Sequence, residues 1–257
     1  MLTPSSSHRT ATGGRMAQAR HAARRREWTP AQLIDLFGSV RLFSKLPAPQ
    51  LEALAQASEH KVVRRGELVI KQADAGDALY VLASGSLLVR RVSKSGTSRG
   101  LNVIEAPGSF GELSLLDSRP RSASIEALED CELFAISRET FLGLLGRDPR
   151  LVDGLIRELG RMIRRLTDQV ADEALLDLPS RVAKTLLRLV DDQVMTGPKD
   201  QPVVALSQGK LAELAGGSRQ SVNAALSTFV VRGLIRMETR RIVITNLPGL
   251  RAKAGIS

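Results

Sequence analysis

The chain has 257 residues, 43% of them apolar and 25% charged, a composition typical of a soluble globular protein. The absence of a run of about 18 apolar residues excludes a transmembrane helix, and the first thirty residues lack the hydrophobic stretch of a secretory signal. The single cysteine, Cys131, excludes an intramolecular disulfide and an iron–sulfur cluster held by several cysteines of this chain. We therefore expect a protein of the reducing cytoplasm, with Cys131 as a buried, inert thiol.

The net charge of +10 is unevenly distributed along the chain. Residues 1–30 carry six arginines and one glutamate, residues 31–176 have a net charge of −1, and residues 177–257 have a net charge of +6. Two basic ends around a neutral middle favour a polyanionic partner, above all nucleic acid. An anionic membrane is the alternative for the N-terminal run.

Residues 1–28 are rich in Ser, Gly, Ala and Arg, which predicts a disordered basic arm. The cluster 20-RHAARRR-26 would add non-specific phosphate contacts. Two alternatives stay open: an unstructured leader without a role, and a translation start at Met16.

The next hundred residues change from a helical to a β-rich pattern. Residues 30–60 carry apolar residues at helical spacing with a break at 47–49, which predicts helix. From residue 61 to about 136, short β-prone runs alternate with Gly and Asp turns, as in a sandwich or barrel. The predicted strands are 67–70, 79–85, 86–92, 101–104, 124–128 and 131–136.

Residues 138–176 are predicted to be helical again. Apolar residues recur there at alternating spacings of three and four, the pattern of a heptad seam. They are Ile156, Leu159, Ile163, Leu166 and Val170. Leu155 and Met162 widen the apolar face, so one side would pack on the β-domain while the other meets a second copy. An ordinary core helix is the alternative.

Residues 177–257 form a second unit that contains a helix-turn-helix pattern. A helix at 179–192 and a loop at 196–202 precede it. Ser207 would cap a short helix, Gly216 and Gly217 supply the turn, and Ser218 would cap a second helix. The residues expected to face the core are Leu211, Leu214, Val222, Leu226, Phe229 and Val230.

The second helix of this motif would read base edges in the major groove. Arg suits guanine and Gln or Asn suits adenine, while helix-capping serines suit phosphate. Residues 234–245 read as two strands, a wing that would touch the DNA backbone. The DNA-binding residues expected from this arrangement are Ser207, Gln208, Ser218, Arg219, Gln220, Ser221, Asn223 and Arg240, with Arg241 beside the last. A protein-interaction hairpin is the alternative, and the +6 charge argues against it.

The order of these segments, with 76-GDALYVLASG-85, 110-FGELSLLDSRPRSAS-124 and 177-D..SR.A.TLL-187, resembles the cyclic-AMP receptor protein / fumarate–nitrate regulator family of bacterial transcription factors. The resemblance covers about residues 31–250. It implies an α+β fold with a cyclic-nucleotide-binding β-roll (a double-stranded β-helix or jelly roll), a long dimerisation helix and a C-terminal winged helix-turn-helix. The expected divisions are 1–28 for the arm, 29–147 for the β-roll, 148–176 for the dimerisation helix and 177–257 for the DNA-binding domain.

The resemblance also implies a phosphate-binding cassette within residues 110–124. Gly111 lets the backbone approach a ligand, and the helical turn that starts at Glu112 attracts its phosphate. Glu112 would accept a hydrogen bond from a ribose 2′-hydroxyl, and Arg121 would pair with the cyclic phosphate. The implied ligand-binding residues are Gly111, Glu112, Leu113, Ser114, Arg121, Ser122 and Thr167. An empty pocket, in which Glu112 and Arg121 pair with each other, is the alternative.

The chain departs from the family pattern at several positions. Leu166 and Thr167 stand where the family's cyclic-AMP receptors have adjacent Thr and Ser on the adenine, so one hydroxyl is kept and one is lost. Thr167 would contact adenine across the dimer, or guanine instead, so the expected ligand is cyclic AMP with cyclic GMP as the alternative. Gln220 replaces a common Glu, Ala224 a common Arg, and Gln208 an Arg at a phosphate contact. A glycine is common where this chain has Ala73.

We therefore expect a homodimeric transcription regulator, not an enzyme, that is controlled allosterically by a cyclic purine nucleotide. The implied partners are a pseudo-palindromic DNA operator and RNA polymerase, without membrane or metal. The alternative is a family member that is independent of nucleotide or senses another signal. Heme is disfavoured because two of the three histidines, His8 and His21, lie in the arm and His60 lies outside the cassette. Catalysis is disfavoured because no nucleophile–base pair, metal cluster or triphosphate loop is present.

Overall fold

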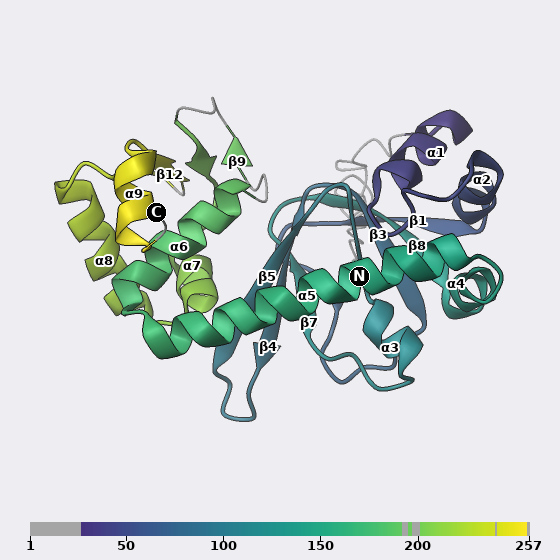
Figure 1. Ribbon diagram of the computed structural model, residues 1–257, viewed down its shortest axis with the longest axis horizontal. Helices are drawn as coiled ribbons and strands as arrows, with labels where there is room; N and C mark the ends of the chain where they lie inside the picture. Colours follow the sequence, from purple (N-terminus) through teal and green to yellow (C-terminus); the bar gives the residue numbers. More distant parts are fainter. Residues whose placement is uncertain (1–26, 192–194, 197–200, 240, 256–257) are drawn as a thin grey trace, which may run out of the picture.

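The computed structural model describes residues 27–191, 195–196, 201–239 and 241–255. A β-rich unit and a smaller helical unit are joined by one long helix, α5 (Pro149–Leu175), which runs along both (Figure 1). The predicted α+β architecture of β-roll, long helix and C-terminal helix-turn-helix is confirmed. Of the predicted basic arm, all but Glu27 and Trp28 lies outside the described residues.

The β-roll consists of two four-stranded antiparallel sheets. One has the order β1 (Ser58–Val63), β8 (Cys131–Ser137), β3 (Ala78–Ser84) and β6 (Gly108–Phe110). The other has the order β2 (Leu68–Ile70), β7 (Ser124–Ala127), β4 (Ser86–Val92) and β5 (Ser98–Glu105). Leu82, Leu87 and Leu133 are fully buried between them, and Cys131 is buried as expected. Burial raises the pKa of the Cys131 thiol to about 11, which keeps it unreactive.

Besides the short α3 (Glu112–Leu116), the roll has three helices: α1 (Pro30–Ser39), α2 (Ala48–Gln56) and α4 (Arg138–Leu145). Phe37 and Phe43 stack at 5.9 Å under α1 and bury the outer face of the first sheet. The predicted helix over 30–60 runs too far, because residues from Ser58 onward pair with β8 as a strand. The predicted helical stretch over 138–176 is divided, since Gly146 ends α4 while Asp148 and Pro149 begin α5.

Helix α5 is apolar on two sides, as its sequence predicts. Leu151 and Leu155 are buried against the roll, where Gly154 allows the backbone of Leu42 to approach. Ile163 and Val170 of the heptad seam are 64% and 70% exposed on the other side. These two seam positions are therefore largely uncovered within the described part of this chain, whereas Leu159 of the same seam packs against the core of the roll.

The C-terminal unit contains α6 (Leu178–Asp191), α7 (Gln208–Ala215), α8 (Arg219–Val231) and α9 (Leu247–Lys253). Its sheet has the order β11 (Ile235–Glu238), β12 (Arg241–Ile244), β10 (Val203–Val204) and β9 (Met195–Thr196). The sheet has four strands where two were predicted, because Val203 and Val204 pair with β12. The prediction that Val230 faces the core is wrong: it is 42% exposed, while Phe229 takes the buried position.

One turn of the roll adopts a conformation that favours glycine. Ala73 has a φ of 72°, in the left-handed region that L side chains rarely adopt. Its amide donates to the carbonyl of Arg121 at 2.9 Å. The turn therefore keeps its geometry with alanine in place of the glycine common in the family, and it is hydrogen-bonded to Arg121 in the loop before β7 (Ser124–Ala127).

Candidate ligand cavity and nucleic-acid interface

A cavity of about 460 Å³ lies between the second sheet of the roll and α5. Its volume falls within the range of small-ligand sites. Six of the seven predicted ligand-binding residues line it: Gly111, Glu112, Leu113, Ser114, Arg121 and Ser122. The fold thus brings the predicted cassette together around one space.

Gly111 determines the local geometry of the cassette. It has a φ of 93° and precedes the short helix α3 (Glu112–Leu116). A Cβ atom at this position would lie 2.8 Å from Nη1 of Arg121. Glycine is therefore required both for the left-handed turn and for the close approach of the guanidinium.

Arg121 is only 6% exposed and is held by neutral acceptors. Its Nη1 donates to the Gly111 carbonyl and to Ser114 Oγ, and its Nη2 donates to the Ala78 carbonyl, each at 2.8 Å. In the described part of the chain, the one carboxylate within 4.0 Å belongs to Asp77, at 3.8 Å, and that side chain is 88% exposed. No ion pair joins Arg121 to Glu112 there. The guanidinium is therefore a fixed, buried and weakly compensated positive charge beside the cavity.

Glu112 is half-buried in the wall of the same cavity. Desolvation is the largest influence on its carboxyl and raises the pKa, and the nearby Glu158 adds to this. Hydrogen bonds from backbone amides and the charge of Arg121 act in the opposite direction. A hydrogen-bond donor on a ligand would stabilise the carboxylate and lower this pKa again.

The α5 side of the cavity differs from what the sequence indicated. Leu166 lines the cavity, whereas Thr167 is exposed outside it and donates its hydroxyl to the Ile163 carbonyl at 3.0 Å. The charged side chains of α5 at the cavity are Glu158, Arg161 and Arg165, and Arg91 of β4 also lines it. Sequence reasoning missed these three arginines, because arginine on a heptad-bearing helix or a β-strand usually indicates a solvated face.

The sheet that lines the cavity also carries the helix-turn-helix. Val89, Arg91 and Ile125 point to the cavity, and their neighbours Arg90 and Glu126 point to the opposite face. On that face, Lys210 of α7 pairs with Glu126 at 2.9 Å. Ser98 donates to Glu213 at 2.8 Å, and Leu214 packs over Gly100. One layer of strands therefore separates the cavity from the first helix of the DNA-binding motif.

The helix-turn-helix has the caps that the sequence predicts. Ser207 Oγ accepts from the Lys210 amide, and Ser218 Oγ accepts from the Ser221 amide. Gly216 forms the turn with a φ of 66°. These caps fix the start of each helix, which is where phosphate contacts are expected.

The residues predicted to contact DNA bases lie in the first turn of α8. Arg219, Gln220 and Ser221 are exposed, as are Ser207 and Ser218, while Gln208 is half-buried. The side chain of Asn223 is less exposed than predicted. It is half-buried, and its Oδ1 atom is buried without a hydrogen-bond partner among the described residues. Its place beside Val222 on the inner face explains this. Arg240 lies outside the described residues, whereas Arg241 is exposed on β12.

Two further features bear on the class of protein. In the portion that the structure covers, no group of three or more His, Cys, Asp or Glu side chains is arranged to hold a metal ion. No helix there is both long and apolar enough to cross a bilayer. The ligand-sized cavity formed by the predicted cassette lies in the β-roll, and the exposed polar helix start lies on α8.

Comparison with known proteins agrees with this division. Residues 60–148 match the family model for a cyclic nucleotide-binding domain, and residues 180–253 match that for a Crp-like helix-turn-helix domain. The chain is 32% identical over 196 residues to the cyclic AMP receptor protein of Thermus thermophilus, covering 76% of this chain and 88% of that protein. It is 29% identical over 221 residues to a CRP-like cAMP-activated global transcriptional regulator of Mycobacterium tuberculosis, covering 86% and 99%.

Solved structures show the same fold at lower identity. A CRP-family transcriptional regulator from Thermus thermophilus superposes with a TM-score of 0.67 and 23% identity, covering 77% of this chain and 97% of the other. The c-di-GMP responsive regulator CLP of Xanthomonas campestris gives a TM-score of 0.68 and 23% identity, covering 77% and 99%.

A cyclic nucleotide-binding domain joined to a Crp-like helix-turn-helix domain defines a transcription regulator. The chain belongs to the cyclic-AMP receptor protein / fumarate–nitrate regulator family of bacterial transcription factors.

Proposed function

We propose that the protein is a homodimeric transcription regulator whose DNA binding is controlled by a cyclic purine nucleotide, with cyclic AMP favoured over cyclic GMP. It acts by binding and not by catalysis. The observation that carries the proposal is the buried Arg121 guanidinium beside a ligand-sized cavity, without a close carboxylate among the described residues.

The buried positive charge of Arg121 favours the binding of a small anion. A buried cation without a close counter-ion is costly, and a ligand phosphate removes that cost while gaining charge-assisted hydrogen bonds. The amides at the start of α3 and the hydroxyl of Ser122 would supply further donors to the phosphate. Glu112, which also lines the cavity, would accept from the ribose 2′-hydroxyl.

The choice of nucleotide rests on relatives and not on the cavity alone. Two curated relatives carry cyclic AMP in their names, and both align over three quarters or more of this chain. Thr167, which the resemblance places on the adenine, faces away from its own chain's cavity. We propose that it reaches the cavity of the second copy across the dimer.

The dimer is proposed from the exposed seam of α5. Ile156, Ile163 and Val170 are each more than 60% exposed and follow a heptad repeat. Aliphatic side chains at these positions gain about 2 kcal/mol each when a second helix covers them. The proposed divisions are the β-roll at 29–147, the dimerisation helix at 148–176 and the DNA-binding domain at 177–257.

DNA recognition is proposed to use the start of α8. A dimer can present two copies of this helix about 34 Å apart, which matches successive major grooves of a pseudo-palindromic operator. Arg219, Gln220 and Ser221 would reach bases, while Ser207, Gln208, Ser218 and Arg240 would contact phosphates. RNA polymerase is the further partner that this role implies, and the cytoplasm the site of action.

Arg121→Ala tests the cassette directly. We expect cyclic AMP affinity to fall by at least about 100-fold, because two charge-assisted hydrogen bonds to the phosphate are lost. Titration calorimetry measures this affinity. Arg121→Lys is a further variant, which keeps the positive charge but lacks the forked guanidinium that can donate two parallel hydrogen bonds. Arg119→Ala, an exposed arginine of the same loop, is the matched control. Unchanged affinity in Arg121→Ala would remove the cassette assignment, and no binding by the wild type would favour the nucleotide-independent alternative.

Glu112 predicts a pH dependence of nucleotide binding. Its pKa is raised above the ordinary 4.5 in the free protein, and a ribose hydroxyl that donates to the carboxylate lowers it. Affinity should therefore be constant well above the raised pKa and fall as the pH falls through it, with protons released on binding. Calorimetry in two buffers of different ionisation enthalpy, at pH about 5.5 and about 8, measures the release. Glu112→Gln should abolish it and the exposed Glu52→Gln should not; proton uptake would contradict the assignment.

Ile163→Glu tests the dimer. A carboxylate from each copy at the centre of the seam would face its counterpart without a partner, so we expect the protein to sediment as a monomer. Val231→Glu, which changes an 88% exposed valine outside α5, is the matched control. If Ile163→Glu and the wild type have the same sedimentation coefficient, the seam is not the dimer interface.

Arg219→Ala tests recognition by α8. We expect a loss of about 1–3 kcal/mol on the preferred operator together with relaxed specificity at one base pair. Binding to a panel of single-base operator variants measures both. Arg232→Ala removes the same charge from the far end of α8 and serves as the control. An equal loss on every sequence would identify Arg219 as a phosphate contact.

A further inference from the structure

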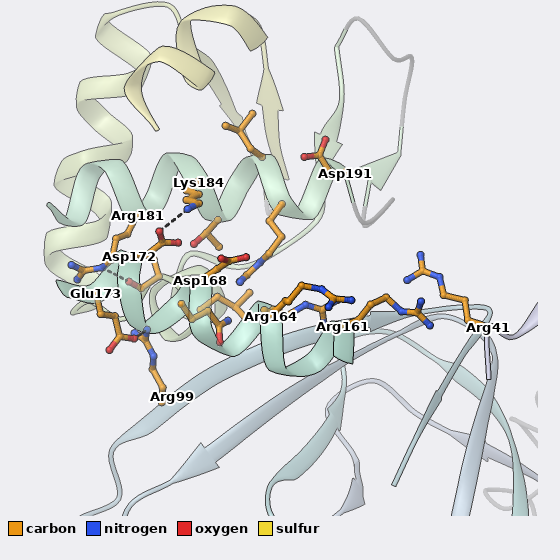
Figure 2. A pocket seen from close by; sticks show the side chains of 17 residues that line it. Arg41, Arg99, Arg161, Arg164, Asp168, Asp172, Glu173, Arg181, Lys184 and Asp191 are labelled. Atoms are coloured by element: carbon orange, nitrogen blue, oxygen red, sulfur yellow. Dashed lines mark hydrogen bonds and ion pairs between the residues drawn. The ribbon is translucent and has the colours of Figure 1, made fainter. Parts of the chain in front are cut away.

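A second cleft lies beside the C-terminal half of α5, on the side of the helix-turn-helix. It has a volume of about 520 Å³ and is enclosed by α5, α6, the start of β5 and the end of α7 (Figure 2). Eight of its lining residues are arginine or lysine and four are aspartate or glutamate. None of the residues predicted from the sequence to bind a ligand or DNA lines it.

The charges at one end of the cleft compensate one another. Lys184 pairs with Asp172 at 2.6 Å, and Arg99 pairs with Glu173 (Figure 2). Arg181 donates to the backbone carbonyls of residues 176, 215 and 216. These groups hold α5, α6 and β5 together and leave little unsatisfied charge.

The other end of the cleft is cationic. Arg41, Arg161 and Arg164 lie along it in a row (Figure 2). Arg161 is engaged by Glu158 at 2.5 Å. For Arg41, Arg164 and Arg165, no side-chain hydrogen bond or ion pair within 4.0 Å involves another residue that the structure describes, the lining carboxylate of Asp168 included.

This arrangement is unfavourable without an anion. Arg161 is three residues from Arg164 and four from Arg165, and like charges at these spacings destabilise a helix by about 0.2–0.5 kcal/mol per pair. Asp168, four residues after Arg164 and three after Arg165, offsets part of this repulsion along α5 but forms no ion pair within 4.0 Å with either among the described residues. The forked guanidinium groups match phosphate oxygens, and arginine is the preferred side chain for such recognition. A bound anion would turn the repulsion among these arginines into attraction.

We propose that the cleft is a second ligand site, for a small anion that carries a chain of two or more phosphates. Arg41, Arg164 and Arg165 bind the phosphates. The source is inorganic polyphosphate or a nucleoside polyphosphate. In the second case, the base would pack on the edge of the core, where the almost fully buried Leu187, Leu214 and Ala215 line the cleft.

The site stays open in the proposed dimer and lies next to the nucleotide cavity. At 100° per residue, Arg161, Arg165 and Asp172 are about half a turn around α5 from Ile163, so the cleft and the seam are on opposite sides. Arg161 and Arg165 line both the cleft and the nucleotide cavity. Variants for a test must therefore be residues of the cleft alone, which Arg41 and Arg164 are.

Titration calorimetry of the full chain with inorganic tripolyphosphate, in buffer of about 0.15 M salt to suppress non-specific attraction, tests the proposal. We expect saturable binding by the wild type, and a loss of affinity of about tenfold or more in Arg164→Ala and in Arg41→Ala. Arg157→Ala, about two turns earlier on the same helix and outside the cleft, should bind as the wild type does. Circular dichroism checks that each variant is folded.

Three comparisons complete the test. Arg121→Ala should keep tripolyphosphate binding; if that variant loses it while Arg164→Ala keeps it, the anion occupies the cassette and the proposal is overturned. Tighter binding of magnesium-free ATP than of tripolyphosphate, lost in Arg164→Ala, identifies a nucleoside polyphosphate, and equal binding identifies the phosphate chain alone. No saturable binding of either probe, or equal loss in Arg157→Ala and Arg164→Ala, overturns it. These results do not depend on cyclic nucleotide binding, which Arg121→Ala tests separately.

Discussion

The burial of the Arg121 guanidinium is the constraint on which the roll depends. Three short hydrogen bonds to neutral acceptors hold it, and two of these acceptors are backbone carbonyls on separate elements, β3 and the turn before α3. Glycine at position 111 follows from it, because any side chain there would meet Nη1. The carbonyl of Arg121 in turn accepts from Ala73, so the turn after β2 is tied to the same residue. The described residues orient the charge by hydrogen-bond dipoles, with the exposed Asp77 carboxylate at 3.8 Å as the nearest counter-charge, and the proposed ligand would supply the rest.

Different faces of helix α5 make different contacts. Leu151 and Leu155 bind it to the roll, and the exposed seam around Ile163 faces outward. Between these faces, Arg161 and Arg165 line two neighbouring spaces. The ion pairs of Asp172 and Glu173 then join its last turns to α6 and β5. One long helix thus contacts each part of the proposed regulatory unit. A small rotation of this helix would therefore change the packing of all of these parts.

The sequence was sufficient for the fold and for most of the cassette, because both depend on local signals. Strand periodicity, the caps Ser207 and Ser218, and glycine at 111 are read within a few residues. The errors arose where pairing with a strand that is distant in the sequence determines the secondary structure. Ser58 to His60 continue a helical pattern yet pair with β8, and Val203 and Val204 pair with β12, about forty residues later in the chain. The arginines on α5 and β4 were missed for the same reason, since only the packed sheet shows that Arg91, Arg161 and Arg165 share a wall.

The alternation of side chains along β4 and β7 has a consequence for how this protein can change over evolution. Residues of one parity touch the cavity and residues of the other touch the helix-turn-helix, so a substitution of Val89 or Ile125 can alter what the cavity accepts without touching α7. An insertion or deletion of one residue within β4 would do the reverse and exchange the two sets. The ligand preference of the roll is therefore open to drift by point mutation, whereas the length of these strands is not.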